Sequence, residues 1–462
     1  MSGHRFDPAI LREYDIRGTV GRTLSEADAA ALGRAFGTTL VRGGGTAVAV
    51  GYDGRLSSPA LEAALVAGLA STGLAVQRVG RGPTPMLSYA AYTLPVDGGV
   101  MVTGSHNPPD DNGFKMTRNR APVYGEAVQA LGRIAAAGDF VEGQGKVEER
   151  PIAAAYLERL LQDVKAGGRP LAVGWDAGNG AGGEIVTALA ARLPGRHVLL
   201  NCEIDGTFPA HHPDPTVPKN LLQLQEAVAR EKLDCGIALD GDADRIGVID
   251  EMGGILWGDQ LLLIFAREVL SRRPGAPIIA DVKTSQVVYD AIAEAGGEPV
   301  MWKTGHSLIK AKMAEMKAPL GGELSGHIFF SDGFYGFDDA IYAGIRLLNI
   351  LGAMSEPLSA FRRTVPAVVS TPEIRIPCPP ELKGSAVEGA RTRLEAAGAE
   401  VNVIDGVRVK TADGWWLLRA SNTQDVLVAR CEAFDRAGLE RLFGILSEQL
   451  KASGLEPPAL EA

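Results

Sequence analysis

One pattern of strand, helix and strand occurs three times in this chain, and it limits the possible fold more than any other feature. Each copy begins with a short apolar run that ends on an aspartate, at Asp53, Asp176 and Asp281. A small-residue loop, an amphipathic helix and a second apolar run follow, as in a parallel βαβ unit with a right-handed crossover. Each copy then reaches a third loop, and these loops read TGSHNPP, LDGDADR and LGGELSGH. Because ligands bind beyond the carboxyl ends of strands in open α/β sheets, we expect the three loops to share one cleft.

The last part of the chain follows a different plan. From about Val368, a strand and a helix lead to apolar runs separated by Asp-Gly turns at Asp405 and Asp413, and a final helix follows. This order predicts a β-α-β-β-β-α unit with an antiparallel sheet. We therefore predict three related α/β domains with mixed sheets and a C-terminal α+β domain. The expected domains are residues 1–150, 151–254, 255–367 and 368–462.

Charge and cysteine content exclude several classes of partner. The formal net charge is −10 and no basic block is long, so neither nucleic acid nor an anionic membrane is expected. No apolar run is long enough to span a bilayer. We expect a cytoplasmic protein that is a monomer or a weak homo-oligomer. The widely spaced cysteines, which favour reduced thiols over disulfides or a zinc site, are Cys202, Cys235, Cys378 and Cys431.

The loop LDGDADR places Asp240, Asp242 and Asp244 at the end of an apolar strand. Three carboxylates that converge repel one another, and a hard divalent cation with oxygen ligands relieves that repulsion. An EF-hand is excluded, because the glycine and the final glutamate of that loop are missing. An acidic surface turn is the alternative. Arg245 adds a guanidinium for a phosphate or carboxylate nearby.

Ser105 follows the apolar run Val100–Val102, in a loop rich in turn-forming residues. Its surroundings do not match the Gly-x-Ser-x-Gly elbow of hydrolases. Since adjacent side chains usually point apart, we do not expect His106 to pair with Ser105 as a base. A metal and a basic neighbour would then activate the oxygen, which suits phosphoryl transfer. For His106 and Asn107 we favour bracing of the loop.

Two further loops carry groups suited to a phosphorylated sugar. Glu323, Ser325 and His327 alternate along what we expect to be an extended segment, which would place them on one side to bind hydroxyls. A solvated edge strand is the alternative. The stretch RASNTQD offers a possible phosphate cradle, although Ser-Asn-Thr is also ordinary turn chemistry. The cradle residues are Arg419, Ser421, Asn422 and Thr423.

A rival signal is the stretch GNGAGG, residues 178–183, which matches the dinucleotide fingerprint and has Glu203 about twenty residues later. Against a nucleotide site, Trp175 and Asp176 stand where the strand should lead directly into glycine. The equivalent positions after Asp53 and Asp281 have no such glycines. We interpret the glycines as a turn of the repeated unit, with a nucleotide site as the alternative.

Together these loops resemble the α-D-phosphohexomutase family, specifically its phosphomannomutase/phosphoglucomutase group. Six motifs occur in the family's order over nearly the whole chain: REYDIRG, TGSHNPPDDNGFK, DGDADR, KTGHSLIK, GGELSGH and RASNT. The resemblance implies a heart-shaped, four-domain enzyme with a central cleft. It implies interconversion of hexose 1-phosphate and hexose 6-phosphate, for mannose, glucose or both. A phosphoserine and a hexose 1,6-bisphosphate intermediate would carry the phosphoryl group, and Mg²⁺ would assist.

The resemblance also implies roles for individual residues. Ser105 would be the phosphoserine and would hold Mg²⁺ together with the three aspartates of the acidic loop. Arg17, Lys115 and His327 are the implied candidates for acid–base chemistry or charge stabilisation. Glu323, Ser325 and His327 would orient the sugar. Further implied contacts with the sugar or its phosphates are Tyr14, Arg245, Lys283, His306, Arg419, Ser421, Asn422 and Thr423.

The subgroup follows from smaller differences. Ser-Asn-Thr in the cradle and Leu324 in the sugar loop are similar to the mannose and glucose enzymes, whereas phosphoglucosamine mutases typically show Ser-Gly-Thr-Glu-Pro. Two positions depart from the family pattern: Gln424-Asp425 replaces a proline-containing ending, and Ala243 replaces a common glycine. Phosphoglucosamine mutase and sugar-phosphate phosphatase are the alternatives.

Overall fold

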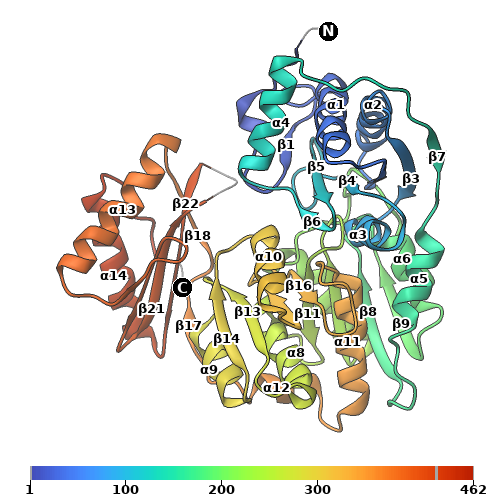
Figure 1. Cartoon of the computed structure of the whole chain (residues 1–462). Helices are drawn as coiled ribbons and strands as arrows, with labels where there is room; N and C mark the ends of the chain where they lie inside the picture. The colour runs from blue at the N-terminus through green and yellow to red at the C-terminus, as the bar shows by residue number, and fades with distance from the viewer. Residues whose placement is uncertain (1–2, 422–424, 461–462) are drawn as a thin grey trace.

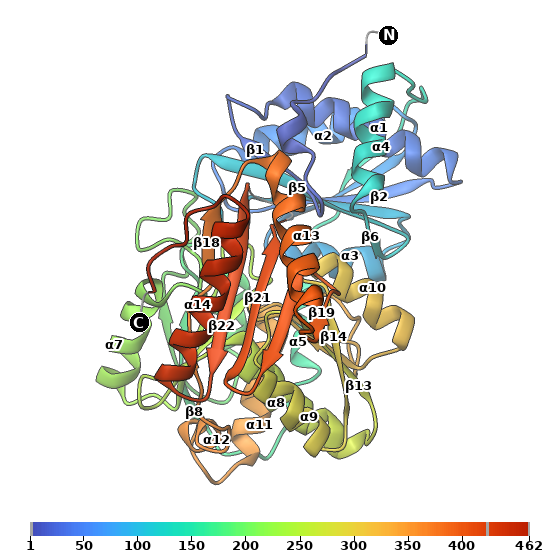
Figure 2. The ribbon, with the colours of Figure 1, turned by 90° about the vertical axis from the view of Figure 1, so that its left-hand side faces the viewer.

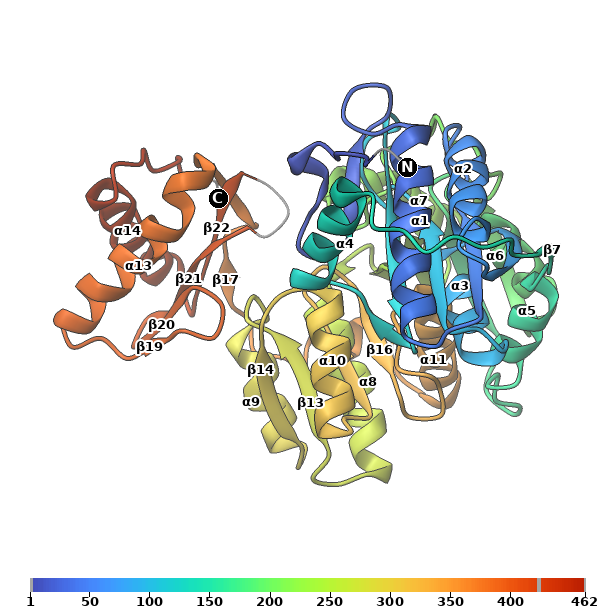
Figure 3. The same ribbon diagram turned by 45° about the horizontal axis from the view of Figure 1, so that its top comes forward.

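The computed structural model describes residues 3–421 and 425–460, which form four β-sheets, each with its own helices (Figure 1). The strand pairing confirms three related α/β domains and a different C-terminal domain. The first three domains pack closely together, whereas the fourth stands to one side, against the third (Figure 1, Figure 3). None of the helices in the described ranges combines the length and apolar character that a membrane crossing requires.

The first domain holds a mixed sheet between helices. Its strands are β1 (Ile16–Thr19), β2 (Ala47–Tyr52), β3 (Ala75–Arg81), β4 (Gly98–Val102), β5 (Asp111–Arg118), β6 (Ala121–Pro122) and β7 (Val147–Glu149). Its helices are η1 (Pro8–Ile10), α1 (Glu26–Arg42), α2 (Ser58–Ala70), α3 (Thr84–Thr93) and α4 (Glu126–Ala137). A capping box between Ser25 and Asp28 begins α1.

The second and third domains repeat this plan. The second contains α5 (Ala153–Leu161), β8 (Leu171–Asp176), α6 (Gly183–Ala190), β9 (Gly195–Leu200), η2 (Pro218–Leu221), α7 (Leu222–Glu231), β10 (Cys235–Leu239), β11 (Ile246–Asp250) and β12 (Ile255–Leu256). The third contains α8 (Gly258–Arg272), β13 (Pro277–Asp281), α9 (Gln286–Glu294), β14 (Glu298–Trp302), α10 (His306–Met316), β15 (Leu320–Gly322), β16 (Ile328–Phe330), α11 (Ala340–Ala353) and α12 (Leu358–Arg362).

One strand order recurs in all three α/β sheets. The orders are β3-β2-β4-β5, β9-β8-β10-β11 and β14-β13-β15-β16. In each set the first three strands are parallel and the fourth is antiparallel to its neighbour. The loops TGSHNPP, LDGDADR and ELSGH each connect the third strand to the fourth. The prediction that three chemically different loops occupy one structural position is therefore confirmed.

The fourth domain is an antiparallel sheet with both of its helices on the face turned away from the other domains (Figure 1, Figure 2). It contains β17 (Val369–Ser370), β18 (Ile374–Pro377), α13 (Pro380–Ala396), β19 (Val401–Asn402), β20 (Val407–Thr411), β21 (Gly414–Ala420), β22 (Val426–Ala433) and α14 (Arg436–Ala452). Four strands, rather than the expected three, follow α13, because the chain also reverses between β21 and β22. The predicted turns at Asp405 and Asp413 are confirmed by the pairing of β19 with β20 and of β20 with β21.

The hydrophobic core is continuous across the first three domains. Helix α11 of the third domain also packs on β8, β10 and β11 of the second sheet. Asp339 begins this helix by accepting a hydrogen bond from the Tyr342 amide, and it also accepts one from the Tyr156 hydroxyl of α5, at 2.7 Å. The fourth domain has a core of its own around Trp416. The three α/β domains therefore form one packed body, on which the strand-end loops have fixed positions.

Candidate active site

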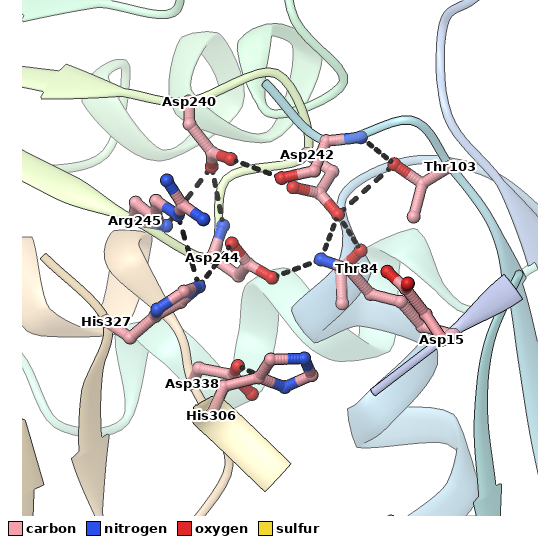
Figure 4. Close-up of polar contacts among 12 residues, drawn as sticks. Asp15, Thr84, Thr103, Asp240, Asp242, Asp244, Arg245, His306, His327 and Asp338 are labelled. Atoms are coloured by element: carbon pink, nitrogen blue, oxygen red, sulfur yellow. Dashed lines mark hydrogen bonds and ion pairs between the residues drawn. The ribbon is translucent and has the colours of Figure 1, made fainter. Parts of the chain in front are cut away.

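The serine loop of the first domain meets the acidic loop of the second (Figure 4). The Ser105 hydroxyl donates a hydrogen bond of 2.8 Å to Asp240 Oδ2. The hydroxyls of Thr84 and Thr103 both donate to Asp242 Oδ2, and the Thr84 amide donates to the Asp242 carbonyl. Residues from two domains are thus brought together in one buried cluster.

The acidic cluster has the properties of a cation site. The carboxylates of Asp240, Asp242 and Asp244 are buried, and one oxygen from each lies within 4.8 Å of the other two. Asp242 Oδ1 is buried and accepts no hydrogen bond, which leaves an oxygen available to a ligand. Burial and the charges of Asp242 and Asp244 raise the pKa of Asp240 well above its usual range. A set of oxygen donors that repel one another fits a hard divalent cation.

Lys115 of β5 places a positive charge beside two of these carboxylates. Its Nζ lies 2.7 Å from Asp242 Oδ2 and also contacts Asp244 Oδ2. Burial would lower the pKa of Lys115, but Asp242 and Asp244 raise it above its usual value. Arg17 of β1 contacts the serine loop, where it donates to the Gly104 carbonyl, and it pairs with Asp15 at 2.7 Å.

The expectation that Ser105 and His106 point apart is wrong. The Ser105 backbone has a φ of 49°, which turns the chain so that Ser105 Oγ lies 3.2 Å from His106 Nδ1. Burial and the cations Arg245 and Arg17 lower the pKa of His106 well below its usual value, so the ring is neutral. Bracing by Asn107 is confirmed, since its side chain accepts from Arg17 at 2.6 Å and donates to Asp111 at 3.0 Å.

The segment from Glu323 to His327 is a tight turn, not the expected extended strand. Gly326 has a φ of 89° and its amide donates to the Glu323 carbonyl, so the turn gathers the side chains instead. His327 Nδ1 lies 2.7 Å from Glu323 Oε2 and 3.1 Å from Ser325 Oγ, and its Nε2 lies 3.2 Å from Asp244 Oδ1. Burial would lower the pKa of His327, but Asp244 and Glu323 raise it to about 9. His327 therefore links the second and third loops.

Tyr14 and His306 lie where the first and third domains meet. The Tyr14 hydroxyl donates to the Thr304 carbonyl at 2.7 Å, and the two rings are 6.0 Å apart between centroids. The His306 ring lies 5.6 Å from that of His327. A small cavity between the two domains is lined by Tyr14, Lys115 and His306 among others. The structure thus brings these predicted residues to one place.

Strand alternation in β21 turns Arg419 toward the third domain. Trp416 and Leu418 enter the core of the fourth domain, whereas Trp415 and Leu417 pack on Val282, and Arg419 follows on the same face. Its Nε pairs with Asp405 Oδ2 at 2.9 Å.

The rest of the predicted cradle is described only in part. Ser421 is buried beside Arg419, and its amide donates to the Val426 carbonyl at 3.0 Å. Asn422 and Thr423 lie outside the described residues.

Lys283 lies in the contact between the third and fourth domains. Its Nζ pairs with Glu373 Oε2 at 2.9 Å, and its carbonyl accepts from Arg430 at 2.6 Å. Arg408 donates to the carbonyls of Val282 and Thr284 on either side. The fourth domain thus fixes the backbone that carries Lys283.

Several residues of the site are not indicated by any motif in the sequence. Thr84 begins a helix, and Asp338, which pairs with Lys310 and lies 3.5 Å from His306, belongs to an ordinary acidic loop. Glu373 belongs to the fourth domain, and it contacts Lys283 only because that domain packs on the third. Asp53 and Arg55 directly follow β2 and are the residues that the sequence could have indicated. Because β2 and β4 are parallel, both strands end at the edge of the sheet that carries the serine loop.

The stretch GNGAGG does not offer a phosphate cradle. The amides of Gly178, Asn179, Gly180, Ala181 and Gly183 all donate to protein oxygens. A Cβ on Gly180 would lie 2.7 Å from the Gly241 carbonyl oxygen, so the glycines allow close packing on the acidic loop. The interpretation as a turn of the repeated unit agrees with these contacts, and the nucleotide alternative does not.

Comparison with known proteins agrees with the division of the chain into four domains. Models of the phosphoglucomutase/phosphomannomutase family match along the chain: alpha/beta/alpha domain I at residues 9–142, domain II at 154–253, domain III at 257–368 and the C-terminal domain at 373–448. A phosphomannomutase/phosphoglucomutase of Pseudomonas aeruginosa is 45% identical over 444 residues, which cover 96% of each chain. A phosphoglucomutase of Neisseria meningitidis is 44% identical and covers 94% of this chain and 95% of its own.

A solved structure shows the same arrangement of domains. It is a phosphoglucomutase/phosphomannomutase family protein from Burkholderia thailandensis, 43% identical, with a TM-score of 0.92 and 99% of each chain covered. The family models, the relatives and this structure agree over all four domains. The chain belongs to the phosphoglucomutase/phosphomannomutase family.

Proposed function

We propose that this protein interconverts hexose 1-phosphate and hexose 6-phosphate, with glucose, mannose or both as the sugar, by passing a phosphoryl group through Ser105. The observation that carries the proposal is the hydrogen bond from the Ser105 hydroxyl to Asp240, within a buried cluster of three carboxylates. The names of the relatives in Pseudomonas aeruginosa and Neisseria meningitidis support the same activity.

The cluster suits Mg²⁺, with Ser105, Asp240, Asp242 and Asp244 as its protein ligands. All four donors are oxygens, and Asp242 Oδ1 has no hydrogen-bond partner. Bound there, Mg²⁺ would neutralise charge on the phosphoryl group during its transfer.

The proposed reaction has two half-reactions. In the first, the bond from phosphorus to Ser105 Oγ breaks, and a bond forms to a hydroxyl of the hexose phosphate. The sugar hydroxyl loses its proton and the serine oxygen recovers one, which leaves a hexose 1,6-bisphosphate. After this intermediate turns end for end, its other phosphate returns to Ser105 by the reverse steps.

Three residues around the serine loop are suited to stabilise charge on the transferring group. Arg17, Lys115 and His327 all have carboxylate neighbours that raise their pKa against the effect of burial. These pKa shifts favour the cationic form of each residue, and the three come from the first and third domains. Fixed cations aimed at a phosphoryl group lower the barrier more than mobile ones, because no reorganisation is needed.

The other proposed residues would bind the sugar and its unreactive phosphate. Glu323 and Ser325 lie beside His327 and would take sugar hydroxyls. Lys283 and Arg419 are each paired with a carboxylate, Glu373 and Asp405, so an arriving phosphate would compete for both cations. The remaining proposed contacts are Tyr14, Arg245, His306, Ser421, Asn422 and Thr423.

Replacing Arg419 with alanine is expected to raise the KM for glucose 1-phosphate by about 10- to 100-fold, with a smaller change in kcat. A charge-assisted hydrogen bond to the unreactive phosphate is lost in both ground and transition states. Steady-state kinetics measure the change. Arg393→Ala is the matched control, because Arg393 contacts Gln449 in the same domain. An unaltered KM in the Arg419 variant would remove Arg419 from the phosphate site.

An assay of purified protein with Mg²⁺ and a trace of glucose 1,6-bisphosphate tests the proposed function. We expect glucose 6-phosphate or mannose 6-phosphate from the corresponding 1-phosphate, without free phosphate. Release of inorganic phosphate as the main product would indicate a phosphatase. Preferred turnover of glucosamine 1-phosphate would indicate the other alternative, a phosphoglucosamine mutase.

A further inference from the structure

A buried arginine that no part of the proposed mechanism uses lies against the serine loop. Arg55 follows β2, and its side chain is 0% exposed. Its Nη2 donates to the carbonyls of Ser105 and Asn107, both at 2.7 Å. Its Nη1 donates to the carbonyls of Asp111, at 2.9 Å, and of Pro108. One guanidinium therefore holds three carbonyls of the serine loop and the carbonyl of the first residue of β5.

Asp53 completes this arrangement on the other side of Ser105. Its Oδ2 accepts a hydrogen bond of 3.1 Å from the Gly104 amide and lies 3.3 Å from Arg55 Nε. Its Oδ1 accepts from the Ser58 hydroxyl. Asp53 therefore holds the Gly104 amide, before Ser105, and Arg55 holds the carbonyls of Ser105 and of residues after it. Both contacts come from one Asp-Gly-Arg stretch at the end of β2.

The second domain encloses the guanidinium from outside. Arg55 lies 5.1 Å from the centre of the Phe208 ring, in a cation–π contact. A Cβ on Gly206 would lie 2.7 Å from Arg55 Cα, and a Cβ on Gly104 would lie 2.4 Å from Arg55 Nε. Gly104 therefore packs directly on the guanidinium group and leaves it little room for another conformation, while Gly206 packs on the backbone of Arg55.

These contacts surround Ser105, whose backbone has an unfavourable conformation. Its φ of 49° lies in the left-handed region, which is unfavourable for serine. That conformation brings Oγ to Asp240, 2.8 Å away. Hydrogen bonds on both sides of Ser105 keep the chain in a conformation that it would not otherwise prefer.

We propose that Arg55 is a positioning residue for phosphoryl transfer, which holds the Ser105 backbone at positive φ and so keeps Oγ against the acidic cluster. This inference depends on the proposed role of Ser105 as the phosphoryl carrier. Arg55 forms no hydrogen bond with the acidic triplet or the sugar loop, so it acts on Ser105 through the backbone of the serine loop. Transfer needs the reacting oxygens in line, and an error of about 1 Å lowers the rate by about 100-fold.

The test replaces Arg55 with lysine, which keeps the charge but cannot span four carbonyls. We expect kcat to fall by about 100-fold, while the KM for glucose 1-phosphate stays close to that of the unaltered protein. Phosphorylation of Ser105 by glucose 1,6-bisphosphate, followed by intact-mass spectrometry, should slow to the same extent. Circular dichroism and thermal unfolding establish the folded fraction, so that rates are compared per folded molecule.

Arg78→Lys is the matched control. Arg78 donates to both oxygens of the buried Glu62 in the same domain, at 2.8 and 2.7 Å, and does not contact the serine loop. We expect this variant to lose thermal stability but to keep its kcat. A kcat equal to that of the unaltered protein in folded Arg55→Lys would overturn the proposal, as would an equal loss of kcat in Arg78→Lys.

A second variant covers the case in which Arg55→Lys does not fold. Phe208→Leu releases the guanidinium from the second domain without removing it, and it should lower kcat without raising KM. Unchanged kcat in that variant would contradict the inference. The proposed function fails separately: it is contradicted if the unaltered protein has no mutase activity, or if Ser105→Ala keeps it.

Discussion

Replacing Ser105 with alanine is expected to leave a folded protein whose mutase turnover is lower by about 10⁴-fold or more. The serine oxygen is the atom that would accept and return the phosphoryl group, and its hydrogen bond to Asp240 places it in the acidic cluster. Without it, neither half-reaction has a phosphoryl acceptor. A coupled assay for glucose 6-phosphate measures the loss.

The matched control for this variant is Ser71→Ala. Ser71 donates to the Gly68 carbonyl at the end of α2, in the same domain and away from the acidic cluster. We expect both alanine variants to unfold within a few degrees of the unaltered protein, and the Ser71 variant to keep full activity. Substantial turnover in folded Ser105→Ala would exclude Ser105 as the phosphoryl carrier.

Replacing Asp242 with asparagine is expected to raise the Mg²⁺ concentration for half-maximal activity by at least about 10-fold. Asp242 Oδ2 accepts hydrogen bonds from Lys115, Thr84 and Thr103, so only Oδ1 is free for a cation. Asparagine removes the negative charge and places an amide group in the cluster. Titration of activity with Mg²⁺ and calorimetry of Mg²⁺ binding measure the change, and the second does not depend on turnover.

Asp250→Asn is a suitable control for the metal titration. Asp250 is another buried carboxylate of the second sheet, where it accepts from the amides of Met252 and Gly254 in the turn after β11. Its replacement should lower stability and leave the Mg²⁺ dependence unchanged. If Asp242→Asn gave the Mg²⁺ titration of the unaltered protein, the acidic cluster would not be the metal site.

The sequence was informative about the fold because each domain repeats its pattern within a short stretch of chain. Apolar runs ending at Asp53, Asp176 and Asp281 predict parallel strands from local periodicity alone. In each domain, the third loop of the pattern then connects the third strand of the set to the fourth. The fourth domain was predicted less well. The sequence predicts three strands after the helix of this domain, because no Asp-Gly pair marks the reversal between β21 and β22.

The details of the site depend on backbone conformations and contacts that no local pattern encodes. The contact between Ser105 and His106 follows from a positive φ at a serine, and the turn at Glu323 follows from Gly326. Arg55 satisfies carbonyls that reach it only when the loop folds back over β2. Residue types could therefore indicate which loops carry chemistry, but not how their side chains lie.

The central claim is that a phosphoryl group resides on Ser105 between the two half-reactions. Its most direct test is to phosphorylate the protein with labelled glucose 1,6-bisphosphate, locate the label by peptide mass spectrometry, and then add unlabelled glucose 1-phosphate. We predict that the label is on Ser105 and passes to the sugar phosphate. Label on another residue, or its release as inorganic phosphate, would contradict the account.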